Sequence, residues 1–133
     1  MVNDMFDKEI KVDDKGLNAD IQSHLLSEEK MREIGFTDFV KEKWYYCKEV
    51  QFPKESRYRN FEITFNVSIP KNGDRLRIDV LDEDFCQPYD YQRMLNKNSK
   101  FEPALIVFEF VEKQMEYLQQ QGVISGHIYG EYI

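Results

Sequence analysis

The 133-residue chain has few of the side chains from which the common protein sites are built. It contains two cysteines, two histidines and one tryptophan, and its 18 basic residues are outnumbered by 25 acidic ones. Two isolated cysteines are too few for a disulfide framework or a four-ligand zinc site. The net charge of -7 argues against a broad surface for nucleic acid or an anionic membrane, and it favours a basic partner.

Long apolar runs are absent as well. No stretch approaches the roughly 20 residues that a transmembrane helix needs, and the acidic N-terminus, MVNDMFDKEIKVDD, lacks the layout of a signal peptide. We therefore expect a cytoplasmic protein that has no membrane partner and keeps two reduced thiols. A disulfide between Cys47 and Cys86 stays open at this stage.

The composition does supply a hydrophobic core, because 41% of the residues are hydrophobic and 14% are aromatic. A chain of this length buries roughly two thirds of the surface that it exposes when unfolded. Residues 1–16 are charged and poor in apolar side chains, so we expect a mobile acidic arm there. Residues 17–133 are expected to form a single domain.

Three segments have the pattern of β-strands. Residues 43–52 are rich in aromatic and β-favouring side chains, which indicates a first strand. Residues 61–69 alternate between apolar and polar side chains, which is typical of an antiparallel strand with one buried face. Asn72-Gly73 is a strong hairpin signal and joins this strand to a return strand over residues 75–81. The apolar positions of the second strand are Phe61, Ile63, Phe65, Val67 and Ile69.

A long helix is predicted over residues 101–122. Pro103 suits the first turn of this helix, and Gly122 suits its end. Apolar residues recur at spacings of three and four, which predicts one buried face. These residues are Ala104, Phe108, Val111, Met115 and Leu118.

Short helices are predicted in the N-terminal part of the domain. One begins near Asn18, with Ile21 and Leu25 one turn apart. A second follows Ser27, which can cap it, and ends at Gly35.

The remaining segments complete a fold of the α+β class. A further short helix is predicted near Tyr89, and the tail over residues 123–133 is a candidate edge strand. We expect an antiparallel three- to four-stranded β-meander packed on a long C-terminal helix, with short N-terminal helices.

The most unusual stretch of the sequence is the acidic segment, residues 79–91, which holds five acids and no base. Carboxylates next to aromatic rings suit a partner surface rich in Arg and Lys, because the rings add contact area at little entropic cost. The other interpretation is that the acids are solvated and the rings turn inward. The candidate partner-binding residues are Asp79, Asp82, Glu83, Asp84, Phe85, Tyr89, Asp90 and Tyr91.

Metal binding and catalysis find less support in the sequence. Asp82 and Asp84 stand one residue apart, but the residues after them do not match a calcium-binding loop. No Gly-rich phosphate loop and no Gly-x-Ser-x-Gly motif occurs. Nothing places His24 or His127 beside a nucleophile. We expect no catalytic residue, no metal site and no cofactor, and we keep a metal-dependent enzyme using residues 79–84 as a third hypothesis.

A basic loop offers a second kind of binding site. Lys54, Arg57 and Arg59 surround Tyr58 in the segment 53–60. Basic and aromatic side chains together can hold single-stranded nucleic acid by charge and stacking. The acidic remainder of the chain would confine such binding to this loop, so it is the alternative to the acidic segment.

The leading hypothesis is a non-enzymatic, acidic protein-binding module whose partner has a basic surface. Small acidic proteins without catalytic motifs are common products of phages and other mobile elements. In its sharpest form, the hypothesis is an inhibitor of a nucleic-acid-handling protein, similar in kind to anti-CRISPR proteins, that covers a basic groove.

Overall fold

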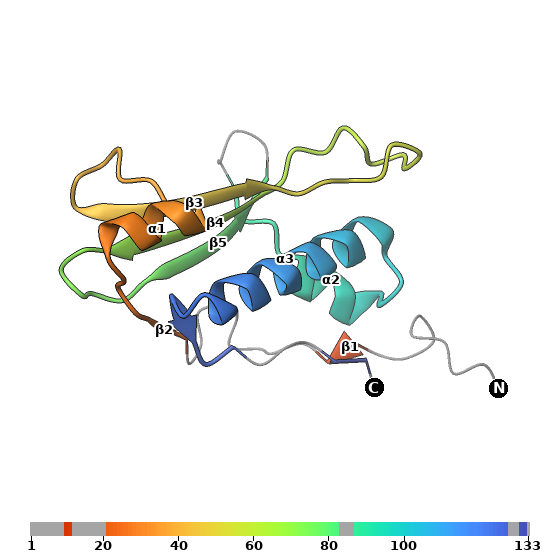
Figure 1. Cartoon of the computed structure of the whole chain (residues 1–133). Helices are drawn as coiled ribbons and strands as arrows, with labels where there is room; N and C mark the ends of the chain where they lie inside the picture. The colour runs from red at the N-terminus through yellow and green to blue at the C-terminus, as the bar shows by residue number, and fades with distance from the viewer. Residues whose placement is uncertain (1–9, 12–20, 83–86, 128–130, 133) are drawn as a thin grey trace.

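The protein has an α+β fold, and the computed structural model describes residues 10–11, 21–82, 87–127 and 131–132 (Figure 1). The described elements are, in chain order, β1 (Ile10–Lys11), β2 (Gln22–Ser23), α1 (Glu28–Ile34), β3 (Lys43–Glu49), β4 (Thr64–Pro70), β5 (Arg77–Leu81), α2 (Tyr91–Lys97), α3 (Glu102–Gln120), β6 (Ile124–Ser125) and β7 (Glu131–Tyr132). Figure 1 shows the sheet of β3, β4 and β5 on one side of the molecule and α3 and α2 on the other. The predicted fold class is confirmed.

The main sheet is an antiparallel meander in the order β3-β4-β5. Alternate side chains of each strand point to opposite faces, so the sheet has an inner face and an outer face. The inner face is buried and holds Trp44, Tyr46, Phe65, Val67, Ile69, Ile78 and Val80. The alternation that the sequence showed in β4 therefore marks the face on which the core forms.

The hairpin between β4 and β5 is confirmed, but its turn is longer than the two residues that Asn-Gly pairs often form. β4 ends at Pro70 and β5 begins at Arg77, so residues 71–76 make the connection. Gly73 has a φ of 88°, and the Asn72 side-chain oxygen accepts a hydrogen bond of 2.9 Å from the Asp74 N–H. This local bond turns the chain within the connection.

The long helix α3 covers the inner face of the sheet, as the periodicity predicted. All five stripe residues from Ala104 to Leu118 are buried. Pro103 lies in the first turn, and Gly122 follows the helix with a φ of 80°. The Tyr46 hydroxyl donates to Oε1 of Gln114, which ties β3 to α3.

The short helix after Ser27 is also confirmed. The Ser27 hydroxyl accepts from the Lys30 N–H at 3.2 Å, and Gly35 ends α1 with a φ of 123°. A side chain at Gly35 would be strained at this φ, and its Cβ would lie 3.2 Å from the ring of Tyr46. This close approach lets Phe36 pack on Tyr46, with the ring centroids 5.2 Å apart.

The helix predicted around Ile21 and Leu25 is wrong. Gln22–Ser23 form β2, which pairs with β6, and the His24 N–H donates to the Val123 carbonyl at 2.8 Å. Tertiary pairing with the chain after α3 overrides the weak helical spacing, and it leaves Ile21 buried and Leu25 exposed. Asn18 lies outside the described residues.

The C-terminal tail forms strands, as predicted, but they do not lie at the edge of the main sheet. Its strands β6 and β7 pair with β2 and β1 in two separate two-stranded ladders. Residues 1–9 and 12–16 lie outside the described residues, so the mobile arm stays a prediction.

The packing of α3 on the sheet predicts large effects at two aromatic positions. Phe65→Ala and Phe108→Ala should each lower the free energy of unfolding by about 3–5 kcal/mol, the usual cost of removing a buried aromatic ring. Glu109→Ala, on the exposed side of α3, should change it little. Urea unfolding followed by circular dichroism measures all three, and equal small effects would contradict the assigned helix face.

Candidate functional site: a groove on the outer face of the sheet

The outer face of the sheet carries three cross-strand rows of mostly polar side chains. The register places Tyr45 beside Ser68 and Arg77, and Cys47 beside Asn66 and Asp79. Glu49, Thr64 and Leu81 form the third row. Most of these side chains are half-buried or exposed, so this face keeps contact with solvent.

A groove of about 430 Å³ runs along this outer face. Its size is in the range of ligand-sized sites in proteins. The lining comes from the three strands and from the segment after α1, and it includes no residue of a described helix. The lining residues are Gly35, Thr37, Phe39, Tyr45, Tyr46, Cys47, Asn66, Val67, Ser68, Arg77, Asp79 and Leu81.

Phe39 is the most exposed apolar side chain at the groove, with 78% of its surface accessible. Its ring is nevertheless held in place, because it stacks on Tyr45 at a centroid distance of 5.0 Å and an interplanar angle of 20°. Thr37 fixes the chain before it through two backbone hydrogen bonds of 2.8 Å to Tyr45. An exposed ring in a defined position can bury area on a partner at little entropic cost.

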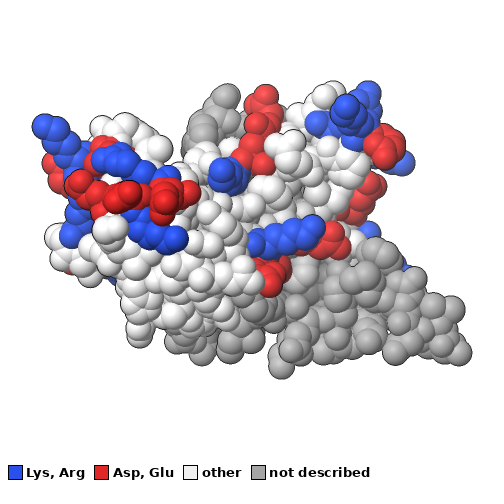
Figure 2. All heavy atoms as spheres, in the orientation of Figure 1, with Lys and Arg blue, Asp and Glu red and all other residues white. Residues whose placement is uncertain are grey.

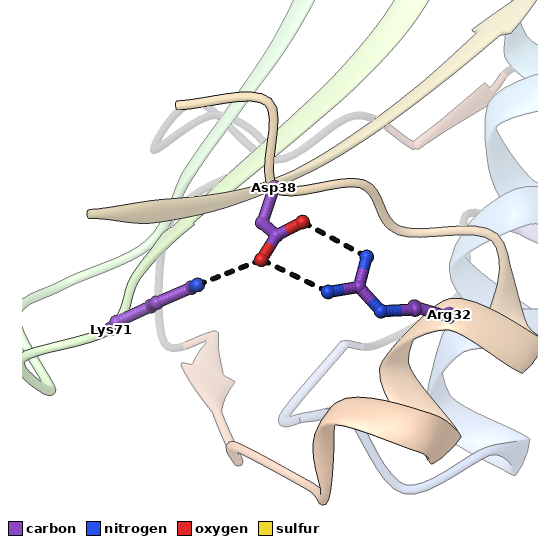
Figure 3. A network of polar contacts seen from close by, with 3 residues as sticks. All are labelled: Arg32, Asp38 and Lys71. Atoms are coloured by element: carbon purple, nitrogen blue, oxygen red, sulfur yellow. Dashed lines mark hydrogen bonds and ion pairs between the residues drawn. The ribbon is translucent and has the colours of Figure 1, made fainter. Parts of the chain in front are cut away.

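The segment that carries Phe39 is anchored by Asp38 (Figure 3). The Asp38 carboxylate accepts two hydrogen bonds from Arg32, at 2.9 and 3.1 Å, and one from Lys71 at 3.1 Å. The two cations also lie over the ring of Trp44, at 5.1 Å for Arg32 and 4.6 Å for Lys71. These contacts connect α1, the segment after it and the β4–β5 hairpin at one end of the groove.

Two hydrogen bonds lower the pKa of Asp38 to about 2. The bond from Arg32 has the larger effect, and the bond from Lys71 has the second largest. With this low pKa, the carboxylate of Asp38 is ionised at neutral pH and keeps both cations in place. Figure 2 shows Lys, Arg, Asp and Glu side chains interleaved around α1, so this network belongs to a surface of mixed charge.

Cys47 is a free, exposed thiol in the middle row of the outer face. Partial burial raises the pKa of this thiol, and the neighbouring Glu49 carboxylate raises it further. The protonated form therefore dominates at neutral pH, which makes Cys47 a poor nucleophile. Cys86 lies outside the described residues.

The acidic segment is only partly described. Asp79 lies on the outer face, lines the groove and pairs with Arg77 at 3.0 Å. Asp82 follows β5 and is half-buried, and its N–H donates to the Gln87 carbonyl at 2.8 Å. Glu83, Asp84 and Phe85 lie outside the described residues, so their predicted role stays a prediction.

The end of the acidic segment turns toward the core. Tyr89 is half-buried, and its N–H donates to the Val80 carbonyl at 2.8 Å. Asp90 caps α2 by accepting from the Arg93 N–H at 3.1 Å. Tyr91 is 2% exposed and packs on Phe108, so its proposed contact with a partner is wrong. An aromatic at the start of an amphipathic helix is drawn into the core.

The basic loop lies between β3 and β4, at the end of the sheet away from α1 (Figure 1). Lys54 and Arg57 are exposed, and Arg59 is exposed with its guanidinium donating to the Ser56 carbonyl at 3.2 Å. Tyr58 is half-buried and meets Phe61 edge to face at 5.1 Å. The loop thus exposes its three basic side chains, while the ring of Tyr58 is engaged in packing.

Phe61 also departs from its predicted place on the buried face. β4 begins at Thr64, and Phe61 is 42% exposed in the loop before it. Its ring packs edge to face on Phe52 at 5.8 Å as well as on Tyr58. The alternating apolar pattern of the sequence therefore begins before β4 does, and Phe61 packs within the loop.

Each histidine has a side-chain partner, and the partner of His24 is a serine hydroxyl, so the expectation that neither histidine lies beside a possible nucleophile is wrong for His24. His24 Nε2 lies 2.7 Å from the Ser125 hydroxyl, and His127 Nε2 lies 2.9 Å from Glu112 Oε2. Among the described residues, no three His, Cys, Asp or Glu side chains gather as metal ligands. None of the described helices has the length and apolarity that crossing a lipid bilayer requires.

Sequence reasoning missed Phe39 and Tyr45 as site residues. No site was predicted at Phe39, and Tyr45 lay only within the strand predicted over residues 43–52. The available signal was an apolar pair, Phe39 and Val40, between charged residues that continue no helical or strand period.

The lowered pKa of Asp38 predicts a specific loss of stability in acid. A carboxyl whose pKa falls from 3.8 to about 2 on folding stabilises the protein above 3.8, and this contribution disappears as the pH falls toward about 2. Across this window, the melting temperature of the wild type should fall more steeply than that of Asp38→Asn. Glu109→Gln on the exposed side of α3 is the control, and parallel curves for all three proteins would contradict the network.

Comparison with known proteins supports the fold and adds no activity. No protein-family model matches the sequence, and no curated protein matches it. The structure is similar to the crystal structure of a DUF1831 family protein from Lactobacillus plantarum. The TM-score is 0.56 at 10% sequence identity, and the alignment covers 78% of this chain and 82% of the other. At this identity the likeness shows a common fold alone.

Proposed function

We propose that the protein is a non-enzymatic protein-binding module that recognises its partner through the groove on the outer face of the sheet. The observation that carries this proposal is Phe39, an aromatic ring that is 78% exposed yet stacked in place at the groove. Binding hot spots are commonly rings of this kind surrounded by contacts that exclude water. Tyr45 and Leu81 supply further apolar surface along the groove.

Charge supports a basic partner. The whole chain carries a net charge of -7, and the three cross-strand rows of the outer face hold Glu49 and Asp79 against one base, Arg77, which pairs with Asp79. Opposite charge on a partner speeds association and selects against acidic competitors. The face in view in Figure 2 shows no broad area of basic side chains among the described residues, which suits this choice of partner.

The finer hypothesis concerns what the partner does. A basic groove that binds nucleic acid is a common source of clustered Arg and Lys on a protein surface. An acidic module covering such a groove would inhibit the partner, in the manner of an anti-CRISPR protein acting in a cytoplasm. This inhibitor hypothesis extends the charge argument, and it uses the groove on the outer face of the sheet as the contact surface.

Nucleic-acid binding by the basic loop is the second hypothesis. Its support is the exposure of Lys54, Arg57 and Arg59 on one short connection. One acid, Glu55, interrupts this cluster, Glu62 follows it, and the net charge of the chain opposes nucleic-acid binding. We therefore rank it below protein binding.

A capture experiment with two matched variants tests the proposal. Tagged wild type, Phe39→Ala and Leu25→Ala are incubated with an extract of the source cells, and the bound proteins are identified by mass spectrometry. Leu25 is also an exposed apolar residue, at 43%, but it does not line the groove. The wild type and Leu25→Ala should retain the same specific protein, and Phe39→Ala should lose most of it.

Two outcomes would contradict the proposal. One is the absence of any protein that the wild type retains above a tag-only control. The other is equal retention by Phe39→Ala, which would show that the groove is not the contact surface. Phe39 is exposed, so the variant should fold as the wild type does, and its melting temperature checks this.

A further inference from the structure

The edge of β3 that faces away from β4 lies beside the groove, and part of this edge has no backbone partner among the described residues. Backbone groups of an antiparallel strand alternate between its two neighbours. In β3, the Tyr45 N–H and carbonyl bond to Thr37 on the side away from β4. On the other side, the Val50 N–H donates to the Ile63 carbonyl, and the Glu42 carbonyl accepts from Lys71, both at 2.8 Å. Odd-numbered residues of β3 therefore direct their backbone groups away from β4.

Cys47 and Glu49 are the next two odd-numbered residues, and Thr37 does not reach them. Among the described residues, no backbone group bonds to either of them on this side, and the Glu49 carbonyl accepts only from the Gln51 side chain at 3.3 Å. Residues 47–49 are also exposed. The opposite edge of the sheet differs, because residues 82, 87 and 89 take part in hydrogen bonds along β5.

We propose that the free edge, residues 47–49, pairs with an extended segment of the partner protein, which adds a strand to the sheet beside β3. The proposal rests on the proposed function, because it gives the mode in which the outer groove is used. Strand addition takes its affinity from backbone hydrogen bonds and its specificity from alternate side chains. An unpaired edge with exposed N–H groups is a template for such pairing.

The side chains around the free edge define the chemistry of the segment. Cys47 and Glu49 point to the outer face, so every second side chain of an added strand would lie on that face as well. The position beside Glu49 on the outer face suits Lys or Arg, because the Glu49 side chain is a carboxylate. The position beside Cys47 suits an apolar side chain, because the groove with Phe39 and Tyr45 begins there.

A second copy of this chain is a poorer occupant of the same edge. Two chains that each carry a net charge of -7 repel one another. An antiparallel pairing of residues 47–49 with themselves would also place Lys48 opposite Lys48, and like charges directly opposite one another destabilise a sheet. The argument therefore favours a basic segment of a different protein.

Proline gives a direct test of edge pairing. Pro lacks an N–H, yet an edge strand accepts it where the N–H would point to solvent. A phage-displayed library of random linear peptides is selected on the wild-type protein, and the enriched peptides are synthesised with a fluorescent label. Their dissociation constants are measured by anisotropy for the wild type, Cys47→Ala, Cys47→Pro and Phe39→Ala.

The proposal expects peptides with a basic residue and an apolar residue two positions apart. Cys47→Pro should bind them about tenfold or more weakly than Cys47→Ala, since both variants lose the thiol but only Pro removes a hydrogen bond and adds a steric block. Equal binding by Cys47→Pro and Cys47→Ala would overturn strand addition. If Phe39→Ala alone abolished binding, the groove function would stand without the added strand.

Amide hydrogen exchange of the wild type keeps the test independent of whether Cys47→Pro folds. Binding of a selected peptide should slow exchange at the N–H groups of Cys47 and Glu49. A peptide that binds while these two amides exchange as fast as before would overturn the proposal. A selection that enriches no peptide would overturn it as well.

Discussion

The fold depends on the burial of the inner face of β4. This strand is the centre of the sheet, and Phe65, Val67 and Ile69 along it are at most 1% exposed. β3 and β5 pair with it on either side, and α3 covers it with its apolar stripe. Because side chains alternate along a strand, the same register that buries these three residues sends Asn66 and Ser68 to the outer face. The groove is therefore a direct consequence of how the core forms.

Most of the fold could be predicted from the sequence because its strongest patterns are local. Alternation identified β4, spacings of three and four identified α3, and Ser27 with Gly35 bounded α1. The errors came where long-range pairing decides the structure. β2 is extended because it meets β6, which follows about a hundred residues later in the chain and leaves no mark on the local pattern. Phe61 fitted the period of β4 but lies before the strand begins.

The candidate site was less predictable than the fold, because it is assembled from side chains distant in sequence. The acidic segment was singled out by its composition, yet of its described candidate binding residues only Asp79 lines the groove, while Asp90 caps a helix and Tyr91 is buried. Phe39 stands out only once the structure shows it stacked on Tyr45 and anchored through Asp38. Exposed apolar residues are common on protein surfaces, so the pair Phe39 and Val40 was only a weak signal in the sequence.

The central claim is that one face of the sheet holds the fold while the other is free for recognition. Two neighbouring residues of β4 test it most directly, since Val67 lies on the inner face and Ser68 on the outer. The measurement is the free energy of unfolding in urea for Val67→Ala and Ser68→Ala. Val67→Ala should lose about 2 kcal/mol or more through the cavity it leaves, whereas Ser68→Ala should change stability by about 0.5 kcal/mol or less. A loss for Ser68→Ala as large as that for Val67→Ala would contradict the account, because it would mean that the outer face is packed like the core.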